Sequence, residues 1–109
     1  MSETFESYIL RFDSNVLKRF ESNVGEGTLF LYNVKTQEFW CGNESAFRIL
    51  NMLDGINTVE RIYYIFHKLH SEIDISDIKS SIDMLFKDLL QKKFLVLVDT
   101  VEISYKKYE

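Results

Sequence analysis

The residues whose types could do chemistry are two histidines, one cysteine, four glycines and 17 carboxylates. His67 and His70 stand three residues apart, but no cysteine or carboxylate lies beside them at the spacing of a zinc motif. No neighbour marks Cys41 as an activated thiolate. The glycines fit neither phosphate-binding spacing, and no carboxylate is paired with a base or nucleophile in a recognisable arrangement. The sequence therefore predicts no catalytic residue, no metal site and no cofactor, and a protein that is not an enzyme.

Length and charge restrict the protein class further. The 109 residues predict a single domain, and the net charge of −4 argues against binding to phosphate backbones through bulk positive charge. Neither a signal peptide nor an apolar run of about 18 residues is present, so we expect a cytoplasmic protein without a membrane span. One cysteine cannot form an internal disulfide.

The first half of the chain reads as short strands. We expect strands at residues 16–20, 28–32 and 37–41, because aromatic and apolar residues cluster there between turn-forming segments. This order predicts an antiparallel meander whose last strand, 37–41, lies at an edge.

The second half reads as three helices followed by one or two strands. Asn43 or Ser45 could cap the first helix, which Asp54 and Gly55 end. Thr58 caps the second, and the third runs from about Ser76 to Lys92. Apolar residues at helical spacing predict the buried faces of the three helices, which are Ala46, Ile49, Leu50 and Leu53, then Val59, Ile62, Tyr63, Phe66 and Leu69, then Ile78, Ile82, Leu85 and Leu89. Strands are expected at 94–98 and 101–105.

Several of these residues resemble the PqqD-like family. The resemblance covers residues 28–96, and it is specific between Asn43 and Ile62. The motif residues are Gly42-Asn43-Glu44-Ser45-Ala46, Ile49-Leu50, Leu53-Asp54-Gly55, Thr58-Val59 and Ile62, with Leu85, Leu89 and Lys93-Phe94-Leu95 resembling the closing helix.

The resemblance implies an α+β fold of the winged helix-turn-helix type, with a three-stranded antiparallel sheet packed on three helices. Members are RiPP recognition elements, which bind the leader of a ribosomally made precursor peptide and present it to a modifying enzyme, often a radical-SAM maturase. The leader adds as a strand to the third strand, beside the third helix. Carried over, these elements are residues 37–41 and 76–92.

Physical reasoning points to the same two elements. An edge strand presents unpaired N–H and C=O groups, which proteins usually protect with Pro, Lys or bulges. Strand 37–41 carries one charge and two large aromatic residues, so a peptide strand could add there. Phe86 and Leu90 widen the apolar arc of the third helix, and nearby charged residues could read charges on the leader. The predicted peptide-binding residues are Gln37, Glu38, Phe39, Trp40, Cys41, Lys79, Asp83, Phe86, Lys87 and Leu90.

Other readings of these residues stay open. Alternation sends Phe39 and Trp40 to opposite faces, so at most one lines the groove. Phe86 and Leu90 could instead pack on the C-terminal tail, and the charged residues could form a solvated face. Residues 1–15 and 97–109 extend beyond the family-like core, and could add strands, cover the groove or form a homodimer surface.

Two other functions share this architecture. A winged-helix DNA-binding regulator would need basic and amide side chains on its recognition helix. The third helix carries Asp77, Asp83 and Asp88 against Lys79, Lys87 and Lys92, which sums to zero. A structural subunit of a maturase complex, without affinity for the leader, is a further alternative.

Overall fold

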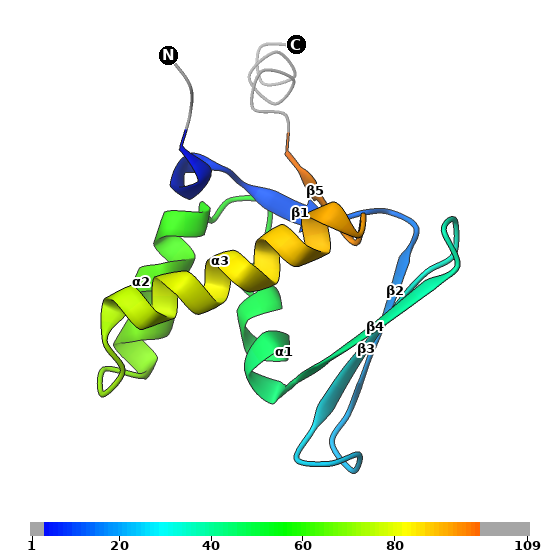
Figure 1. The fold of residues 1–109 in the computed structure, drawn as a ribbon, viewed down its shortest axis with the longest axis horizontal. Helices are drawn as coiled ribbons and strands as arrows, with labels where there is room; N and C mark the ends of the chain where they lie inside the picture. The colour runs from blue at the N-terminus through cyan, green and yellow to red at the C-terminus, as the bar shows by residue number, and fades with distance from the viewer. Residues whose placement is uncertain (1–3, 99–109) are drawn as a thin grey trace.

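The structure, a computed structural model, describes residues 4–98 and has the mixed α+β architecture that the sequence predicts (Figure 1). The predicted strand at 101–105 and the rest of segment 99–109 lie outside the described residues. The elements, in chain order, are η1 (Phe5–Ser7), β1 (Leu10–Phe12), β2 (Val16–Glu21), β3 (Thr28–Asn33), β4 (Glu38–Asn43), α1 (Glu44–Leu50), α2 (Val59–Leu69), α3 (Ile75–Gln91) and β5 (Leu95–Leu97).

Strands β2, β3 and β4 form a three-stranded antiparallel sheet in chain order, as predicted. The side chains of Leu29, Leu31 and Asn33 are buried, so they mark the face of the sheet that meets the core. Phe30 and Tyr32, which alternate with these residues along β3, lie on the other face. We call these two sides the inner face and the outer face of the sheet.

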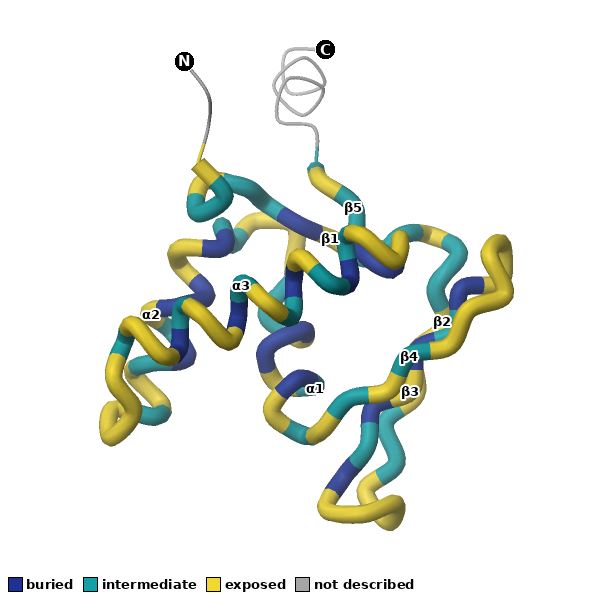
Figure 2. The backbone as a smooth tube through the Cα atoms, viewed as in Figure 1, coloured by how far each residue is buried: buried dark blue, intermediate teal, exposed yellow. Residues whose placement is uncertain are grey.

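The core lies between the inner face of the sheet and the three helices (Figure 2). Tyr63, Phe86, Phe94 and Leu31 are its largest fully buried side chains, together with Leu10 and several other aliphatic residues. The predicted core positions of α2 and α3 are buried in all but two cases. Leu69 is 68% exposed at the end of α2, and Leu85 of α3 is only partly buried, while Phe86 takes its place in the core.

Helices α1 and α2 begin at predicted capping residues. The side chain of Asn43 accepts a hydrogen bond from the N–H of Ala46 at 2.9 Å, and that of Thr58 accepts one from Arg61 at 3.2 Å. Helix α1 ends at Leu50, before the predicted stop at Asp54, because residues 51–57 form turns held by Asp54 and Asn57 side chains.

The N-terminal extension and the residues after α3 pair with each other. Strand β1 runs antiparallel to β5, which makes a separate two-stranded sheet. The carbonyl of Tyr8 also accepts a hydrogen bond from Val59 N–H at 2.8 Å, which ties the extension to α2. Of the roles left open for the extension, the structure shows strand formation, at a site away from β4. None of the helices described between residues 4 and 98 is long and apolar enough to cross a membrane.

Candidate functional site

Strand β4 is an edge of the three-stranded sheet, as the sequence predicts. It pairs with β3 on one side, and within residues 4–98 no strand pairs with its other side. The hairpin that leads into β4 ends at Gln37, whose φ of 64° is uncommon for a residue with a side chain. The unpaired backbone groups of β4 are therefore available for an additional strand.

Asn33 fixes the position of this hairpin. It is the one buried polar side chain among the described residues, at 2% exposure. Its Oδ1 accepts hydrogen bonds from the N–H groups of Lys35 at 2.9 Å and Thr36 at 3.1 Å. Its Nδ2 donates to the carbonyl of Lys93 at 2.9 Å. The start of β4 is thus attached to the chain just after α3, across 60 residues of sequence.

The two aromatic residues of β4 lie on opposite faces, as alternation predicts. Phe39 is 77% exposed on the outer face, while Trp40 packs against the core on the inner face. The Trp40 ring lies over Gly42, where an added Cβ would be 2.6 Å from Cζ3 of the ring and 3.1 Å from Cβ of Ala46. Gly42 is therefore required by this close approach, and it lets the indole lie flat along the strand.

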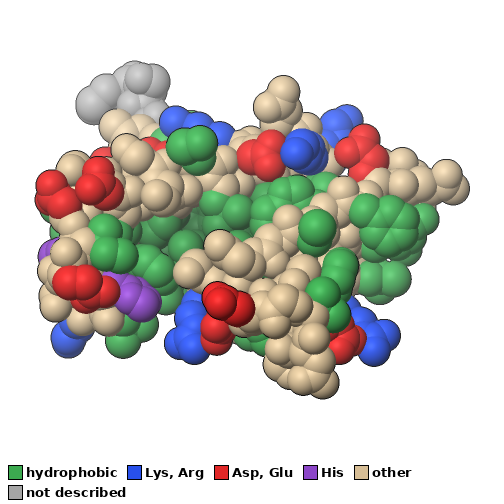
Figure 3. All heavy atoms as spheres, turned by 60° about the horizontal axis from the view of Figure 1, so that its bottom comes forward, with side chains coloured by type: hydrophobic (Ala, Val, Ile, Leu, Met, Phe, Trp, Pro, Cys, Tyr) green, Lys and Arg blue, Asp and Glu red, His purple; other side chains and the backbone are tan. Residues whose placement is uncertain are grey.

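An apolar cleft of about 380 Å³ opens beside the end of β4. Its walls come from the last residue of β4, from α1, from α2 and the loop after it, and from one flank of α3. The lining residues are Asn43, Ser45, Ala46, Ile49, Phe66, Ile73, Asp77, Ile78, Ser81, Ile82 and Leu85. Figure 3 shows hydrophobic side chains gathered in a band across this part of the molecule.

A second hollow, of about 430 Å³, lies at the other end of β4. It is lined by Thr36, Glu38, Gln91, Lys92 and Lys93. Helix α3 therefore shares a depression with each end of β4, through its first turns near Asn43 and its last turn near Glu38. An extended peptide at the edge of β4 would have α3 on its other side.

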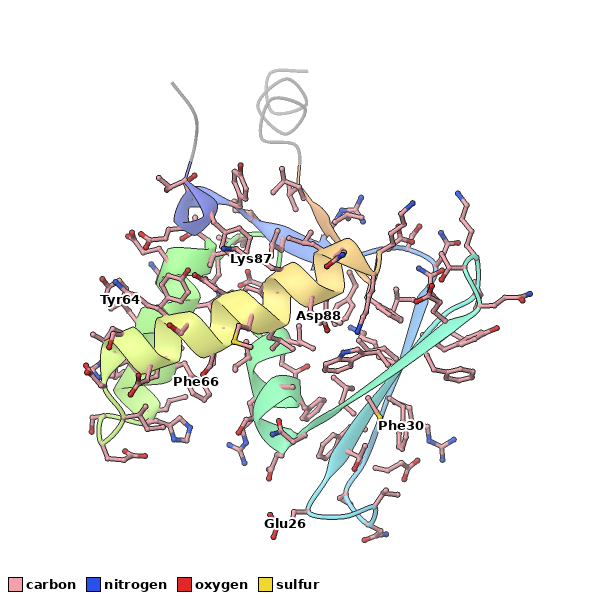
Figure 4. All side chains as sticks on the ribbon, in the orientation of Figure 1. Glu26, Phe30, Tyr64, Phe66, Lys87 and Asp88 are labelled. Carbon is pink, nitrogen blue, oxygen red and sulfur yellow. The ribbon has the colours of Figure 1, made fainter. Side chains whose placement is uncertain are left out.

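The flank of α3 that faces this cleft is not the predicted one. Lys79 lies with its Nζ 5.5 Å from the ring centre of Tyr64, and Lys87 with its Nζ 4.9 Å from that of Phe5. The labelled Lys87 extends toward η1 in Figure 4. Asp83 accepts a hydrogen bond from the hydroxyl of Tyr63. These three charged residues are directed at α2 and η1, and none of them is among the residues that line this cleft.

The Tyr63–Asp83 pair has a structural role between α2 and α3. Burial of the phenol and the hydrogen bond to the Asp83 carboxylate both raise the pKa of Tyr63 well above its usual range. Tyr63 therefore stays neutral and continues to donate to Asp83.

The two apolar residues predicted for the groove floor are also absent from the lining of this cleft. Phe86 is 0% exposed and belongs to the core, so it offers no surface to a peptide. Leu90 is partly buried, and its spacing from Lys79 and Asp83 puts it on their flank of α3. The opposite flank of α3 was not predicted to be part of the site. There Asp77, Ser81 and Leu85 recur every four residues and line the cleft. Residues spaced by four lie on one side of a helix, but Lys79, Asp83 and Lys87 on the other flank have the same spacing.

The contacts that this site offers are those of a binding surface. Between residues 4 and 98, no three potential metal ligands of the His, Cys, Asp or Glu type are grouped together. The apolar walls and the free strand edge offer dispersion contacts and backbone hydrogen bonds instead.

No protein-family model and no curated protein matches this chain. Among solved structures, the chain is similar to TbiB1, determined in complex with the TbiA(beta) leader peptide. The two share 15% sequence identity with a TM-score of 0.66, and the match covers 78% of this chain and 93% of TbiB1. At this identity, the similarity establishes the fold.

Proposed function

We propose that this chain is a non-catalytic protein that binds the leader of a ribosomally made precursor peptide. The leader adds as a strand to β4 and is presented to a separate peptide-modifying enzyme. The observation that carries the proposal is the free edge of β4 directly beside the apolar cleft. The fold shared with TbiB1, whose solved complex contains a leader peptide, supports it.

Two kinds of contact would hold the leader. The outward N–H and C=O groups of β4 would form backbone hydrogen bonds, which provide affinity for extended peptides of many sequences. One or two apolar side chains on the inner side of the bound strand would fill the cleft between Ile49, Phe66 and Leu85. Burial of an apolar side chain contributes about 1.5–3 kcal/mol, so this anchor would select the leader.

The class of the enzyme partner follows from the resemblance to the PqqD-like family, which implies a radical-SAM maturase. The chain itself would supply recognition, and the enzyme the chemistry. The charges of α3 sum to −1, from three Asp against two Lys, and two of its acids are engaged in pairs, Asp83 with Tyr63 and Asp88 with Lys92. We therefore propose that nucleic acid is not a partner.

The first test is a titration with synthetic peptides from short open reading frames beside the gene. Trp40, the only tryptophan, lies on β4 and provides the fluorescence signal. We expect micromolar or tighter binding confined to the leader half of one peptide. N-methylation of single amides along that peptide should abolish binding at every second position, because only alternate N–H groups point toward β4. Loss of binding at positions that do not alternate along the peptide would contradict strand addition.

Variants of the cleft test where the peptide is anchored. Ser81→Trp would fill the cleft from an exposed position, and we expect peptide binding to weaken by more than tenfold, with the melting temperature unchanged. Met84→Trp is the matched control, since Met84 is 74% exposed on the same helix and is not part of the cleft lining. Equal affinities for the two variants would place the anchor elsewhere. Salt-dependent binding to duplex DNA, with no peptide binding, would overturn the proposed function.

A further inference from the structure

The outer face of the sheet carries a row of apolar side chains that ends at the free edge. Leu17 of β2 lies opposite Tyr32 of β3, and Tyr32 lies opposite Phe39 of β4. The rings of Tyr32 and Phe39 are 4.5 Å apart between centroids. Leu17 is 61% exposed and Phe39 77%, so most of this row is in contact with solvent. Phe30, on the next row, points away from the helices in Figure 4.

Phe39 is the member of this row that lies at the free edge of the sheet. A strand added to β4 would place one residue opposite Phe39, with the two Cβ atoms about 4.5–5.5 Å apart. That residue would extend the row of Leu17, Tyr32 and Phe39 by one member. Its neighbours in the added strand would point to the inner face, and the residue three positions along, opposite Gly42, would point toward the cleft. A single peptide would therefore contact both faces of the sheet at once.

The chemistry of this part of the outer face favours an apolar side chain. Phe39, Cys41 and Asn43 are the outward residues of β4, and none of them carries a charge. The charged residues of this face, Arg19 and Glu21, lie on β2 at the far edge and pair with each other. An apolar or aromatic residue opposite Phe39 would gain contacts there, whereas a charged residue would find no partner.

A second copy of the chain is a poorer occupant of this face. Six residues on each of three strands cover roughly 300 Å², which is well below the roughly 800 Å² that each partner buries in a stable complex. A row of apolar side chains ending at a free edge fits one more strand better than another whole protein.

We propose that the bound leader contacts side chains on both the inner and the outer face of the sheet, and that its outward side chain opposite Phe39 is apolar or aromatic. This inference rests on the proposed function. It adds that the leader carries apolar residues about three positions apart, one opposite Gly42 and anchored in the cleft, the other packed on Phe39 and Tyr32.

The probe is a peptide selected from a displayed library of random 15-residue sequences against the full chain. Phe39→Asp should weaken binding of that peptide roughly fivefold, the upper range for one cross-strand pair. Leu17→Asp is the matched control, because it makes the same kind of change on the same row at the opposite edge. We expect it to leave affinity within twofold. Replacing the outward apolar residue of the peptide by Lys should restore binding to Phe39→Asp and weaken binding to the unmodified protein.

Cys41 provides an independent measure of which residues face outward. With oxidised glutathione as the oxidant, cysteines placed one at a time along the peptide should form a disulfide with exposed Cys41 most rapidly at the outward position opposite it. Inward positions should not react, and the residue opposite Phe39 should lie two positions from the reactive one.

The outcomes separate the two proposals. Unchanged affinity for Phe39→Asp, with Ser81→Trp still preventing binding, overturns the reading of the outer face and leaves the proposed function intact. Similar losses for Phe39→Asp and Leu17→Asp, together with a change in molecular mass, would identify the face as a contact between copies and overturn the inference. A library that yields no peptide sensitive to Ser81→Trp overturns both.

Discussion

The two edges of the three-stranded sheet differ in how they are protected. Strand β2 carries Lys18, Arg19 and Glu21 among its six residues, and the last two form an ion pair. Strand β4 carries a single charge, Glu38, at its first position. Charged side chains along an edge discourage pairing with other chains. The comparison teaches that one edge of the sheet carries charged side chains that discourage an added strand, while the other edge is nearly free of them.

Hydrogen bonds also hold both ends of the β4 edge in place. Asn33, the last residue of β3, ties the β3–β4 hairpin to Lys93, and Asn43 at the end of β4 caps α1. Between them, the Trp40 ring lies flat over Gly42. A strand edge fixed at both ends loses little conformational freedom when a peptide binds, which favours affinity. Strand β2 itself makes no hydrogen bond to the helices within residues 4–98, although the N–H of Asp13, three residues before it, donates to the carbonyl of Phe94 at 3.0 Å.

The largest effect is expected from breaking the anchor of β4. Asn33→Leu removes three hydrogen bonds and leaves the carbonyl of Lys93 without this partner, so the free energy of unfolding should fall by about 2–3 kcal/mol. Urea denaturation measures the change. Asn23→Leu, at an exposed position in the β2–β3 loop, should change stability by less than about 0.5 kcal/mol. Comparable losses would show that Asn33 does not anchor the edge.

A smaller effect is expected from changing the inner surface of β4. Gly42→Val would force the Trp40 ring out of its position, at a cost of about 1–3 kcal/mol, and would move the fluorescence of Trp40 to longer wavelength. Cys41→Val, one residue away on the outer face, should leave both the emission and the stability nearly unchanged. An unshifted emission spectrum for Gly42→Val would mean that the ring does not depend on the glycine.

The smallest effect on stability should come from removing the basic side chains of β2. Lys18→Val combined with Arg19→Val should change the free energy of unfolding by less than about 0.5 kcal/mol, because both residues are exposed. Self-association should nevertheless increase, since the edge becomes apolar and β-branched. Sedimentation velocity at several concentrations tests this. Arg61→Val with Lys68→Val, on α2, removes the same charge from a helix and should leave the molecular mass as in the unmodified protein.

Local patterns were sufficient to predict most of the elements. Alternating burial placed Phe39 and Trp40 on opposite faces, and the side chains of Asn43 and Thr58 identified the starts of α1 and α2. These features depend on residues within one or two turns of each other. The position of β4 at an edge followed from the order of three short strands joined by tight turns.

The flank of α3 that lines the cleft could not be chosen from the sequence, because the two flanks are similar. Ile78, Ile82 and Leu89 define the core column. One flank carries Asp77, Ser81 and Leu85, and the other carries Lys79, Asp83 and Leu90. Each is a mixture of polar and apolar residues, spaced by four positions on the first flank and by four and seven on the second. The choice depends on where α2 and η1 pack, and those contacts join residues far apart in sequence, such as Lys87 and Phe5.

The sequence by itself determined the α+β fold class, the Thr58 cap of α2, two candidate caps for α1 and the single charge of β4, because these are set by side-chain types at short spacings. The tertiary structure alone decided that β1 pairs with β5 rather than with β4, and that Leu85 rather than Phe86 faces the cleft. Both outcomes depend on the relative placement of whole elements. That placement minimises exposed apolar surface over the entire molecule, and no local pattern contains it.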